Sequence, residues 1–275
     1  MAVQTTRTSP SEGASLPGNE RKDAWWTGTL SFFLLFSFFG MWATFRAFQN
    51  DFYDSASIAT LGSHYLSPFY SPTFKLGFKL GNYNISPALL ILVFPLCFRL
   101  SCYYYRKSLY RAYLADPLGC AVNEPKPLAA ARYKKYRGER ALPLLAMNFH
   151  RYSFYMAVLI LVILWKDTIE AFFFTVDGGT HFGVGFGSLV FLINAILLSL
   201  YTFSCHSWRH LIGGGVDCYS CSALTRTKHG VWQKVSFLNE RHGTWAMTSL
   251  CSVLLADMYV YFITHQQVTD LIFKI

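Results

Sequence analysis

Four side chains of types that commonly bind metals lie within one short stretch of the chain. His206 and His210 stand four positions apart, and Cys218 and Cys221 form a C-x-x-C pair after a run of three glycines. Residues four apart lie on the same face of a helix, so both imidazoles could reach one metal site. Glycine accepts positive φ freely, so the glycine run lets the chain turn back and bring the thiols over the histidines. The pattern predicts a metal site with two nitrogen and two sulfur ligands.

Two histidines and two cysteines can bind zinc, and they are also the ligands of a Rieske-type [2Fe–2S] centre. The usual Rieske spacings, C-x-H and C-x-x-H, are absent from the chain. The ligand types therefore leave iron–sulfur and zinc chemistry open, together with an interpretation in which the four side chains bind nothing. Cys205 is an alternative sulfur ligand, and His150 and His242 are reserve nitrogen ligands.

Composition and the length of the apolar runs indicate a membrane protein. Hydrophobic residues make up 53% of the chain and charged residues only 14%. About 20 helical residues cross a hydrocarbon layer, and the runs lack the polar alternation of a strand barrel. We predict an all-α integral membrane bundle over residues 24–275, preceded by a disordered cytoplasmic tail at 1–23. The five predicted transmembrane helices are residues 25–48, 85–105, 152–174, 183–212 and 244–273.

Basic residues are unevenly distributed between the two sides of this bundle. The segments 106–151 and 213–243 hold many Lys and Arg side chains, whereas 49–84 and 175–182 together hold only two Lys. Basic loops stay on the cytoplasmic side, so we expect a cytoplasmic N-terminus and an external C-terminus. This rule accounts for the formal net charge of +9 without nucleic acid as a partner, and membrane lipid is an expected anionic contact.

This topology places several ligand candidates in one layer at the cytoplasmic ends of the helices. Cys205 and His206 end the fourth helix, His150 and His242 begin the third and fifth, and Cys102 closes the second. Thiols on the cytoplasmic side stay reduced, so we expect the C-x-x-C to be a redox or metal motif rather than a bridge. Two of these histidines could also hold a single haem b, but the chain does not support a second haem.

Arg99 is a charged residue inside the second predicted helix. A charge in a membrane span is functional by default, although Arg99 could reach the interface along its aliphatic stem and Tyr105 could belong to an aromatic belt. A quinone site needs an apolar slot with donors for the carbonyl groups. The predicted quinone-binding residues, all expected in the same layer, are Arg99, Tyr105, Arg209 and His242.

These features resemble the single membrane-anchor, cytochrome b-type subunit of actinobacterial succinate dehydrogenase (complex II). The resemblance rests on the five-helix layout, the glycine run, the C-x-x-C and the sequence Cys205-His206-x-x-Arg209-His210. Mycobacterial members of this family are associated with a membrane-embedded Rieske-type cluster in place of haem. The resemblance therefore favours a [2Fe–2S] cluster on His206, His210, Cys218 and Cys221.

The resemblance implies an electron-transfer role within an enzyme of the respiratory chain and the tricarboxylic acid cycle. The chain would dock the flavoprotein and iron–sulfur subunits and pass electrons to a quinone, expected to be menaquinone, in the bacterial inner membrane. It has no flavin fingerprint and no soluble domain, so we assign it no catalytic residue for succinate oxidation. Two other functions stay open: a haem b quinone-reactive subunit, and a non-redox membrane protein with a structural zinc site.

Overall fold

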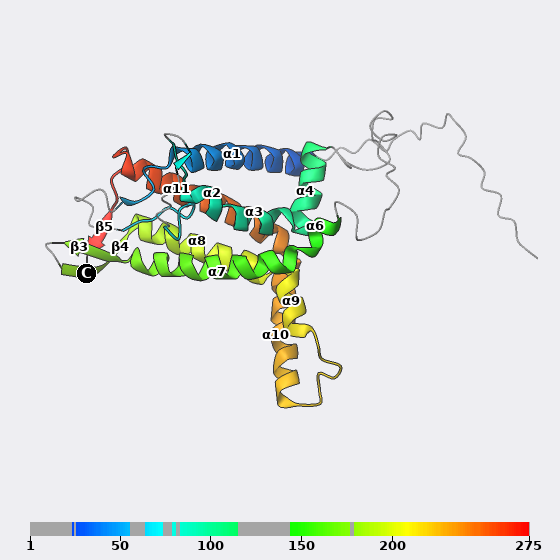
Figure 1. The fold of residues 1–275 in the computed structure, drawn as a ribbon. Coiled ribbons are helices and arrows are strands. Elements are labelled where there is room, and N and C mark those ends of the chain that lie inside the picture. The colour runs from blue at the N-terminus through cyan, green and yellow to red at the C-terminus, as the bar shows by residue number, and fades with distance from the viewer. Residues whose placement is uncertain are drawn as a thin grey trace, which may run out of the picture.

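The fold is given by a computed structural model (Figure 1). It describes residues 24, 26–55, 64–73, 79–80, 83–114, 144–176 and 179–274. The predicted tail at 1–23 lies outside the described residues, and so does most of the predicted basic loop, at 115–143.

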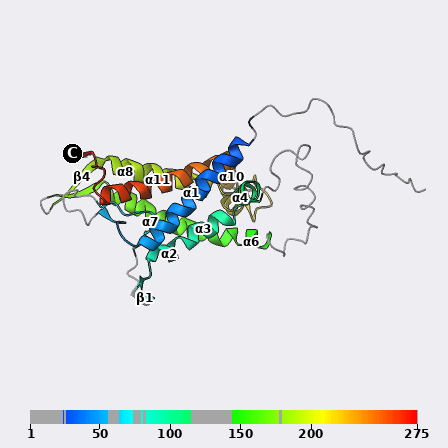
Figure 2. The ribbon, with the colours of Figure 1, turned by 90° about the horizontal axis from the view of Figure 1, so that it is seen from above.

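Four long apolar helices run along the length of the molecule and form its body (Figures 1 and 2). α11 is the most deeply enclosed of the four: 50% of the residues in its apolar 18-residue stretch are buried. In the corresponding stretch of α1, only 6% are buried. The surface of α1 is therefore free for lipid or for a partner subunit. The four helices, each long and apolar enough to cross a membrane, are α1 (Thr27–Gln49), α7 (His150–Glu170), α8 (Phe186–Phe203) and α11 (His242–Thr264).

The second predicted span is broken. α2 (Pro87–Ile91) and α3 (Val93–Leu100) follow each other, and α4 (Tyr103–Tyr113) then leaves at a bend of 87°. The prediction of one helix over 85–105 was therefore wrong beyond Leu100. The sequence of α4 carries basic side chains, which hydrocarbon does not accommodate, so this helix lies across the end of the bundle instead (Figure 1).

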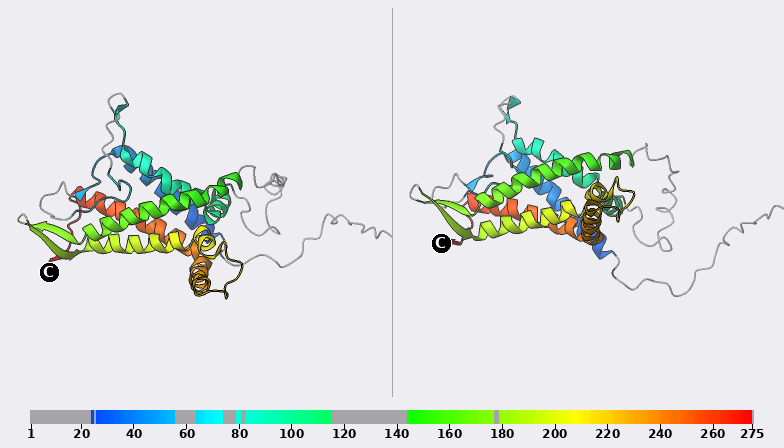
Figure 3. Two further views of the ribbon diagram at one scale, coloured as in Figure 1. Left: turned by 60° about the horizontal axis from the view of Figure 1, so that its bottom comes forward. Right: turned by 90° about the horizontal axis from the view of Figure 1, so that it is seen from below.

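The fourth predicted span also ends earlier than expected. α8 ends at Phe203, the backbone is extended at Cys205, and α9 (His206–Gly213) starts in a new direction. α9 and α10 (Ala223–Glu240) form a hairpin that projects from the end of the bundle, roughly perpendicular to the long helices (Figures 1 and 3). The predicted span over 183–212 is thus corrected to the bounds of α8, because the histidines and arginine of α9 leave the apolar layer.

The opposite end of the bundle carries a small antiparallel sheet. β4 (Gly179–Gly185) pairs with β3 (Phe173–Val176) on one side and with β5 (Ile272–Lys274) on the other. The fifth predicted span, 244–273, therefore ends at Thr264, and its last residues form a strand. Two further short strands, β1 (Lys79–Leu80) and β2 (Tyr83–Asn84), and a short helix, α6 (Leu144–Asn148), complete the elements of the described residues.

The two ends of the bundle thus differ in character. The start of α1, α4 and the α9–α10 hairpin lie at one end, and the C-terminal strand lies at the other (Figure 1). The start of α1 and the last strand therefore lie at opposite ends of the bundle. The assignment of the hairpin end to the cytoplasm stays a prediction that rests on the basic residues.

Candidate metal centre and quinone slot

Two cysteine–histidine pairs meet at the hairpin end of the bundle. Cys102 Sγ lies 3.4 Å from His242 Nε2, and Cys205 Sγ lies 3.0 Å from His150 Nε2. The four residues come from the α3–α4 bend, the start of α11, the α8–α9 bend and the start of α7. Both cysteines are free thiols, exposed by only 3% and 0%. Packing of distant segments therefore gathers a set of two sulfur and two nitrogen donors.

The two helix bends turn the thiols toward the interior. Cys102 and Cys205 each precede a helix with extended backbone, at φ −71°, ψ 131° and at φ −63°, ψ 142°. At the second bend, Ser207 N–H donates to Cys205 Sγ at 3.4 Å. Both bends contain the same dipeptide, Ser-Cys, at 101–102 and 204–205. Each bend therefore presents a hydroxyl group and a thiol group together.

The two serines fix the histidine tautomers in a crossed pattern. Ser101 Oγ lies 3.0 Å from His150 Nδ1 and donates its own proton to the carbonyl four residues earlier, at 2.6 Å. Ser204 Oγ lies 2.7 Å from His242 Nδ1 and donates to the carbonyl three residues earlier, at 3.0 Å. With each hydroxyl proton on its carbonyl, the serine accepts from Nδ1–H, and Nε2 then accepts from the thiol that it faces. Each Ser-Cys dipeptide thus contacts both histidines, one through the hydroxyl and the other through the thiol.

Aromatic rings hold both imidazoles in place. Phe98 stacks on His150 with ring centroids 4.9 Å apart, and Tyr201 stacks on His242 at 5.1 Å. Such pairs stabilise by about 0.5–1.5 kcal/mol beyond the area they bury. A pocket of about 780 Å³, lined by both imidazoles and by His206, opens this region toward the surface. The candidate centre is therefore packed on its inner side and reachable from the hairpin end.

Burial favours the uncharged form of the Cys205 thiol, and partial burial favours the uncharged form of the His206 imidazole. Burial raises the pKa of the Cys205 thiol to about 11. Burial, followed by repulsion from His210, lowers the pKa of His206. Since the thiolate is the metal-binding form of cysteine, a metal that binds Cys205 must displace its proton.

The ligand set predicted from the sequence is divided by the structure. His206 Nε2 and His210 Nε2 lie 2.9 Å apart on one face of α9, in agreement with their spacing. Cys218 and Cys221 are joined to each other in a disulfide. The expectation of a reduced pair is corrected, because the C-x-x-C spacing brings the two Cα atoms within 5.6 Å, which is close enough for a bridge. Metal binding by these four residues together stays a prediction.

Arg99 is buried inside the bundle, with an exposed fraction of only 6%. Its guanidinium donates to the Ala246 carbonyl and to the Ser249 hydroxyl, at 3.1 Å each, and also to the phenol oxygen of Tyr105. The Tyr105 hydroxyl in turn donates to the Ala246 carbonyl at 2.7 Å. Arg99 therefore does not extend to the interface, and it lies against Tyr105, another of the predicted quinone residues.

An apolar groove of about 380 Å³ lies between α1, α3, α7 and α8, with Arg99 and Tyr201 in its lining. The Tyr201 ring is buried, and its centroid lies 4.7 Å from the Arg99 guanidinium. Its hydroxyl, which lies near the Cys102 thiol, makes no hydrogen bond of normal geometry among the described residues. A buried hydroxyl without a partner costs about 1–3 kcal/mol, so Tyr201 has a donor available for a ligand.

Sequence reasoning missed Tyr201 and the two serines. Tyr201 contacts both His242 and Arg99. It therefore connects the groove with the thiol–imidazole set, which consists of Cys102, Cys205, His150 and His242. Its signal in the sequence was a polar aromatic residue in an apolar run, three positions before the second Ser-Cys dipeptide. The repetition of Ser-Cys at the ends of two spans was the signal for the serines.

The two remaining predicted quinone residues, His242 and Arg209, make other contacts than Arg99 does. His242 belongs to the thiol–imidazole set. Arg209 joins the two helices of the hairpin, because its Nε donates to Ser236 Oγ at 2.9 Å and its guanidinium lies 4.7 Å from the Trp232 ring centroid.

Comparison with known proteins places this arrangement in a family. A protein-family model described as "Actinobacterial succinate dehydrogenase subunit SdhC" matches residues 27–266, from the start of α1 to just beyond α11. A chain of a solved structure, the Mycobacterium smegmatis Sdh1 complex in the apo form, is 37% identical with a TM-score of 0.75, and the match covers 95% of this chain and 96% of that chain. No curated protein matches the sequence. The chain therefore belongs to the actinobacterial SdhC family and is a membrane subunit of a succinate dehydrogenase complex.

Proposed function

We propose that this subunit transfers electrons to a quinone through a Rieske-type [2Fe–2S] cluster bound by Cys102, Cys205, His150 and His242. The observation that carries the proposal is that each thiol lies within hydrogen-bond distance of an imidazole Nε2. Two thiolates and two imidazoles are the ligands of a Rieske-type centre. Zinc accepts the same donor types, so the experiment below is chosen to separate the two.

The grouping of the donors favours a cluster over a single ion. Among the described residues, no three His, Cys, Asp or Glu side chains converge as they would around one ion. The four donors instead lie as two Cys–His pairs, and a Rieske-type centre would take the two thiolates on one iron and the two imidazoles on the other. When bound, such a cluster would supply a one-electron acceptor of raised potential, since imidazole replaces thiolate on one iron.

The chain's own contribution is to orient the four donors and keep them dry. Ser101 and Ser204 hold Nδ1–H of the two imidazoles. A hydrogen bond to the other ring nitrogen of a ligating histidine fixes its tautomer and raises its basicity. Phe98 and Tyr201 cover one face of each ring and exclude water from it.

The set predicted from sequence spacing, His206, His210, Cys218 and Cys221, is the competing proposal. Its two cysteines would have to be reduced before they could bind a metal. Its two histidines are exposed, so water would compete for them. For these reasons the buried set is the better supported one.

The proposed quinone site is the groove beside Arg99. The guanidinium has five N–H donors, and the Tyr201 hydroxyl is a further donor, so both can bind quinone carbonyl oxygens. Tyr105 supports Arg99 from behind through their hydrogen bond. The apolar lining along α1, from Phe36 to Phe48, suits the isoprenoid tail of menaquinone. Tyr201 places this groove beside His242, which gives a short path between the two sites.

The proposed partners are the flavoprotein and iron–sulfur subunits of the complex. Electrons from the soluble part must reach the thiol–imidazole set, which lies at the hairpin end of the bundle. The pocket lined by His206 opens at this end, so we place the docking surface of the iron–sulfur subunit here. The predicted basic loop, which the sequence suggested as part of that surface, lies mostly outside the described residues.

Electron paramagnetic resonance of the purified complex tests the proposal. A mild reductant should give a Rieske-type signal, because it leaves low-potential, all-cysteine clusters oxidised. Cys102→Ser and Cys205→Ser should each abolish this signal, whereas Cys218→Ser and Cys221→Ser, the matched controls, should retain it. The flavoprotein and iron–sulfur subunits should co-purify with all four variants, which shows that the complex has assembled.

Three results would overturn the assignment. Loss of the signal in the Cys218 and Cys221 variants alone would move the cluster to the competing set. Zinc bound to the wild-type subunit, with no Rieske-type signal, would replace electron transfer with a structural metal site. Strong visible bands from bound haem would identify a haem b subunit.

A further inference from the structure

The α9–α10 hairpin is a firm arm outside the bundle. Arg209 links its two helices through Ser236 and Trp232. The turn is closed by a hydrogen bond of 2.9 Å from the Tyr219 hydroxyl to the Gly213 carbonyl. At Gly213 an added Cβ would lie only 2.6 Å from the Trp232 ring, so the two helices pack too closely there for any side chain. The arm is therefore a defined surface rather than a flexible connection.

The direction of the arm relative to the long helices defines its place in a membrane. The hairpin runs roughly perpendicular to α7, α8 and α11 and starts where these helices meet the end of the bundle (Figures 1 and 3). A segment perpendicular to spanning helices, at their ends, runs parallel to the membrane surface. α10 lies on the side toward the spans, and the loop 214–222 lies on the side away from them (Figure 1).

α10 carries an apolar strip that the hairpin leaves uncovered. Leu224 and Val231 are exposed by 69% and 40%, and Leu238 continues the strip another seven residues along the chain. Residues seven apart lie on one face of a helix. Lys228 and Lys234 flank this face on either side at helical spacing. An apolar strip with flanking lysines is typical of a helix that lies in the membrane interface.

We propose that α10 lies in the interface of an anionic membrane, with Leu224, Val231 and Leu238 at the boundary of headgroups and acyl chains. Lys228 and Lys234 contact lipid phosphates, because a lysine stem can lie along apolar surface while its ammonium group stays in water. Lipid is the better occupant than a protein partner for two reasons on this surface. The backbone of α10 lies on the side of the arm toward the spans (Figure 1), and the arm has five basic residues, counting the Arg241 that follows α10, against Asp217 and Glu240.

Lipid photolabelling of the complete complex tests this proposal. The complex is reconstituted in vesicles of phosphatidylcholine alone or with phosphatidylglycerol, each containing a phospholipid with a diazirine high on its acyl chain. Peptide mass spectrometry should then find the label in residues 223–240, more strongly in the anionic vesicles, and not in the loop 214–222. The loop serves as an internal control because it lies on the opposite side of the arm.

Surface variants separate the apolar and the electrostatic parts of the proposal. Leu224→Gln with Val231→Gln should reduce labelling of 223–240 to the level of the loop, whereas Gln233→Ala on the opposite face should leave it unchanged. Lys228→Gln with Lys234→Gln should abolish the preference for anionic vesicles. Unlabelled α10 in both vesicles, or cross-links from α10 to another subunit in place of lipid label, would overturn the proposal. Co-purification of the other subunits with each variant shows that the variant has folded and assembled.

Discussion

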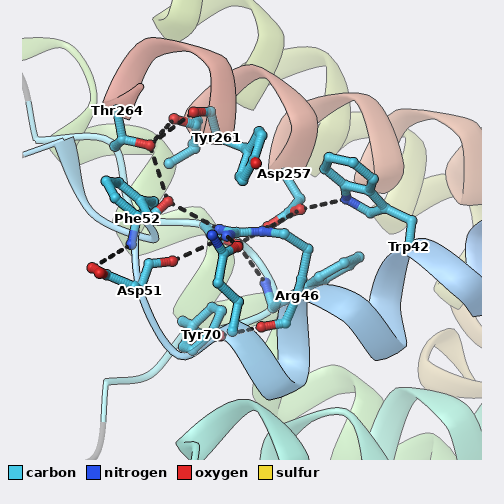
Figure 4. A network of polar contacts seen from close by, with 12 residues as sticks. Trp42, Arg46, Asp51, Phe52, Tyr70, Asp257, Tyr261 and Thr264 are labelled. Atoms are coloured by element: carbon cyan, nitrogen blue, oxygen red, sulfur yellow. Dashed lines mark hydrogen bonds and ion pairs between the residues drawn. The ribbon is translucent and has the colours of Figure 1, made fainter. Parts of the chain in front are cut away.

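Asp257 on α11 and Arg46 on α1 form an ion pair in which both side chains are completely buried, with Arg46 Nε 3.1 Å from Asp257 Oδ2. Trp42 Nε1–H also donates to this carboxylate, at 2.6 Å (Figure 4). The guanidinium donates further to the carbonyls of Asp51 and Phe52, at 3.0 Å each (Figure 4). The pair therefore joins α1, α11 and the segment after α1 at the end of the bundle opposite the hairpin.

Breaking this pair from one side should strongly destabilise the subunit. Asp257→Ala leaves the Arg46 charge buried without a counter-charge, which costs about 3–5 kcal/mol. The double substitution Arg46→Met and Asp257→Leu should recover most of that loss, because apolar groups replace both charges. Thermal unfolding of the detergent-solubilised complex, followed by tryptophan fluorescence, measures the difference.

Lys166→Gln is the matched control for this experiment. Lys166 Nζ lies 2.6 Å from Glu170 Oε1, but the two side chains are 65% and 48% exposed. Exposed ion pairs contribute little to stability. If Asp257→Ala and Lys166→Gln shifted the unfolding temperature equally, the buried pair would have no special role.

Removing either serine behind the histidines should weaken metal binding without removing a ligand. Ser101→Ala or Ser204→Ala frees an Nδ1–H and allows the imidazole to turn or to change tautomer. Loss of such a partner typically lowers metal affinity about 10–100-fold. Non-haem iron retained after treatment with a chelator, together with the Rieske-type signal, measures this. Ser199→Ala is the control, since Ser199 lies on α8 and accepts from Trp165 Nε1 at 2.9 Å; equal iron loss there would refute the specific role.

The groove beside Arg99 should control quinone reduction but not succinate oxidation. Arg99→Leu should lower the rate with quinone by about one to two decades, because a buried donor contributes about 1–3 kcal/mol. Tyr201→Phe keeps the ring on His242 and removes only the hydroxyl, so KM for quinone should rise about threefold to tenfold while the cluster signal persists. Tyr113→Phe removes a hydroxyl that lies 2.7 Å from Ser37 Oγ and should change neither value. Unchanged quinone kinetics in both groove variants would exclude this site.

The hairpin end of the bundle should face the cytoplasm. Basic residues in and beside the hairpin predict this orientation, and the C-terminal strand lies at the opposite end (Figure 1). A reporter enzyme that is active only outside the cytoplasm should therefore be active when it is fused after Ile275. An inactive reporter at this position would invert the orientation and place the candidate metal centre away from a soluble electron donor.

The long apolar runs could be predicted from the sequence, but the breaks in two of them could not. Composition and length suffice to find α1, α7, α8 and α11. The breaks occur at Ser101–Cys102 and Ser204–Cys205, where neither residue is a strong helix breaker. The backbone is extended at Cys102 and Cys205, and the serine before each cysteine contacts a histidine of α7 or α11, which lie far away in the sequence.

The sequence grouped the four residues of the candidate centre by position but did not predict which of them pair. Charge distribution placed Cys102, His150, Cys205 and His242 in one layer, and the structure brings them into contact. The spacing of His206 and His210 correctly predicted their contact on one helix face. That spacing carries no information about how separate helices pack, however, and packing is what joins each thiol to a histidine from another helix. The Arg46–Asp257 pair was not predicted for the same reason.

The crossed contacts of the two Ser-Cys dipeptides have a consequence for biogenesis. Cys102 faces His242 and Cys205 faces His150, so the first two residues in chain order, Cys102 and His150, do not form a pair with each other. A nascent chain has its first thiol–imidazole pair only when residue 205 has been synthesised, and it has the full donor set only when α11 has entered the membrane. The donor set of the proposed centre is therefore completed late, after every span that contributes a donor has been synthesised.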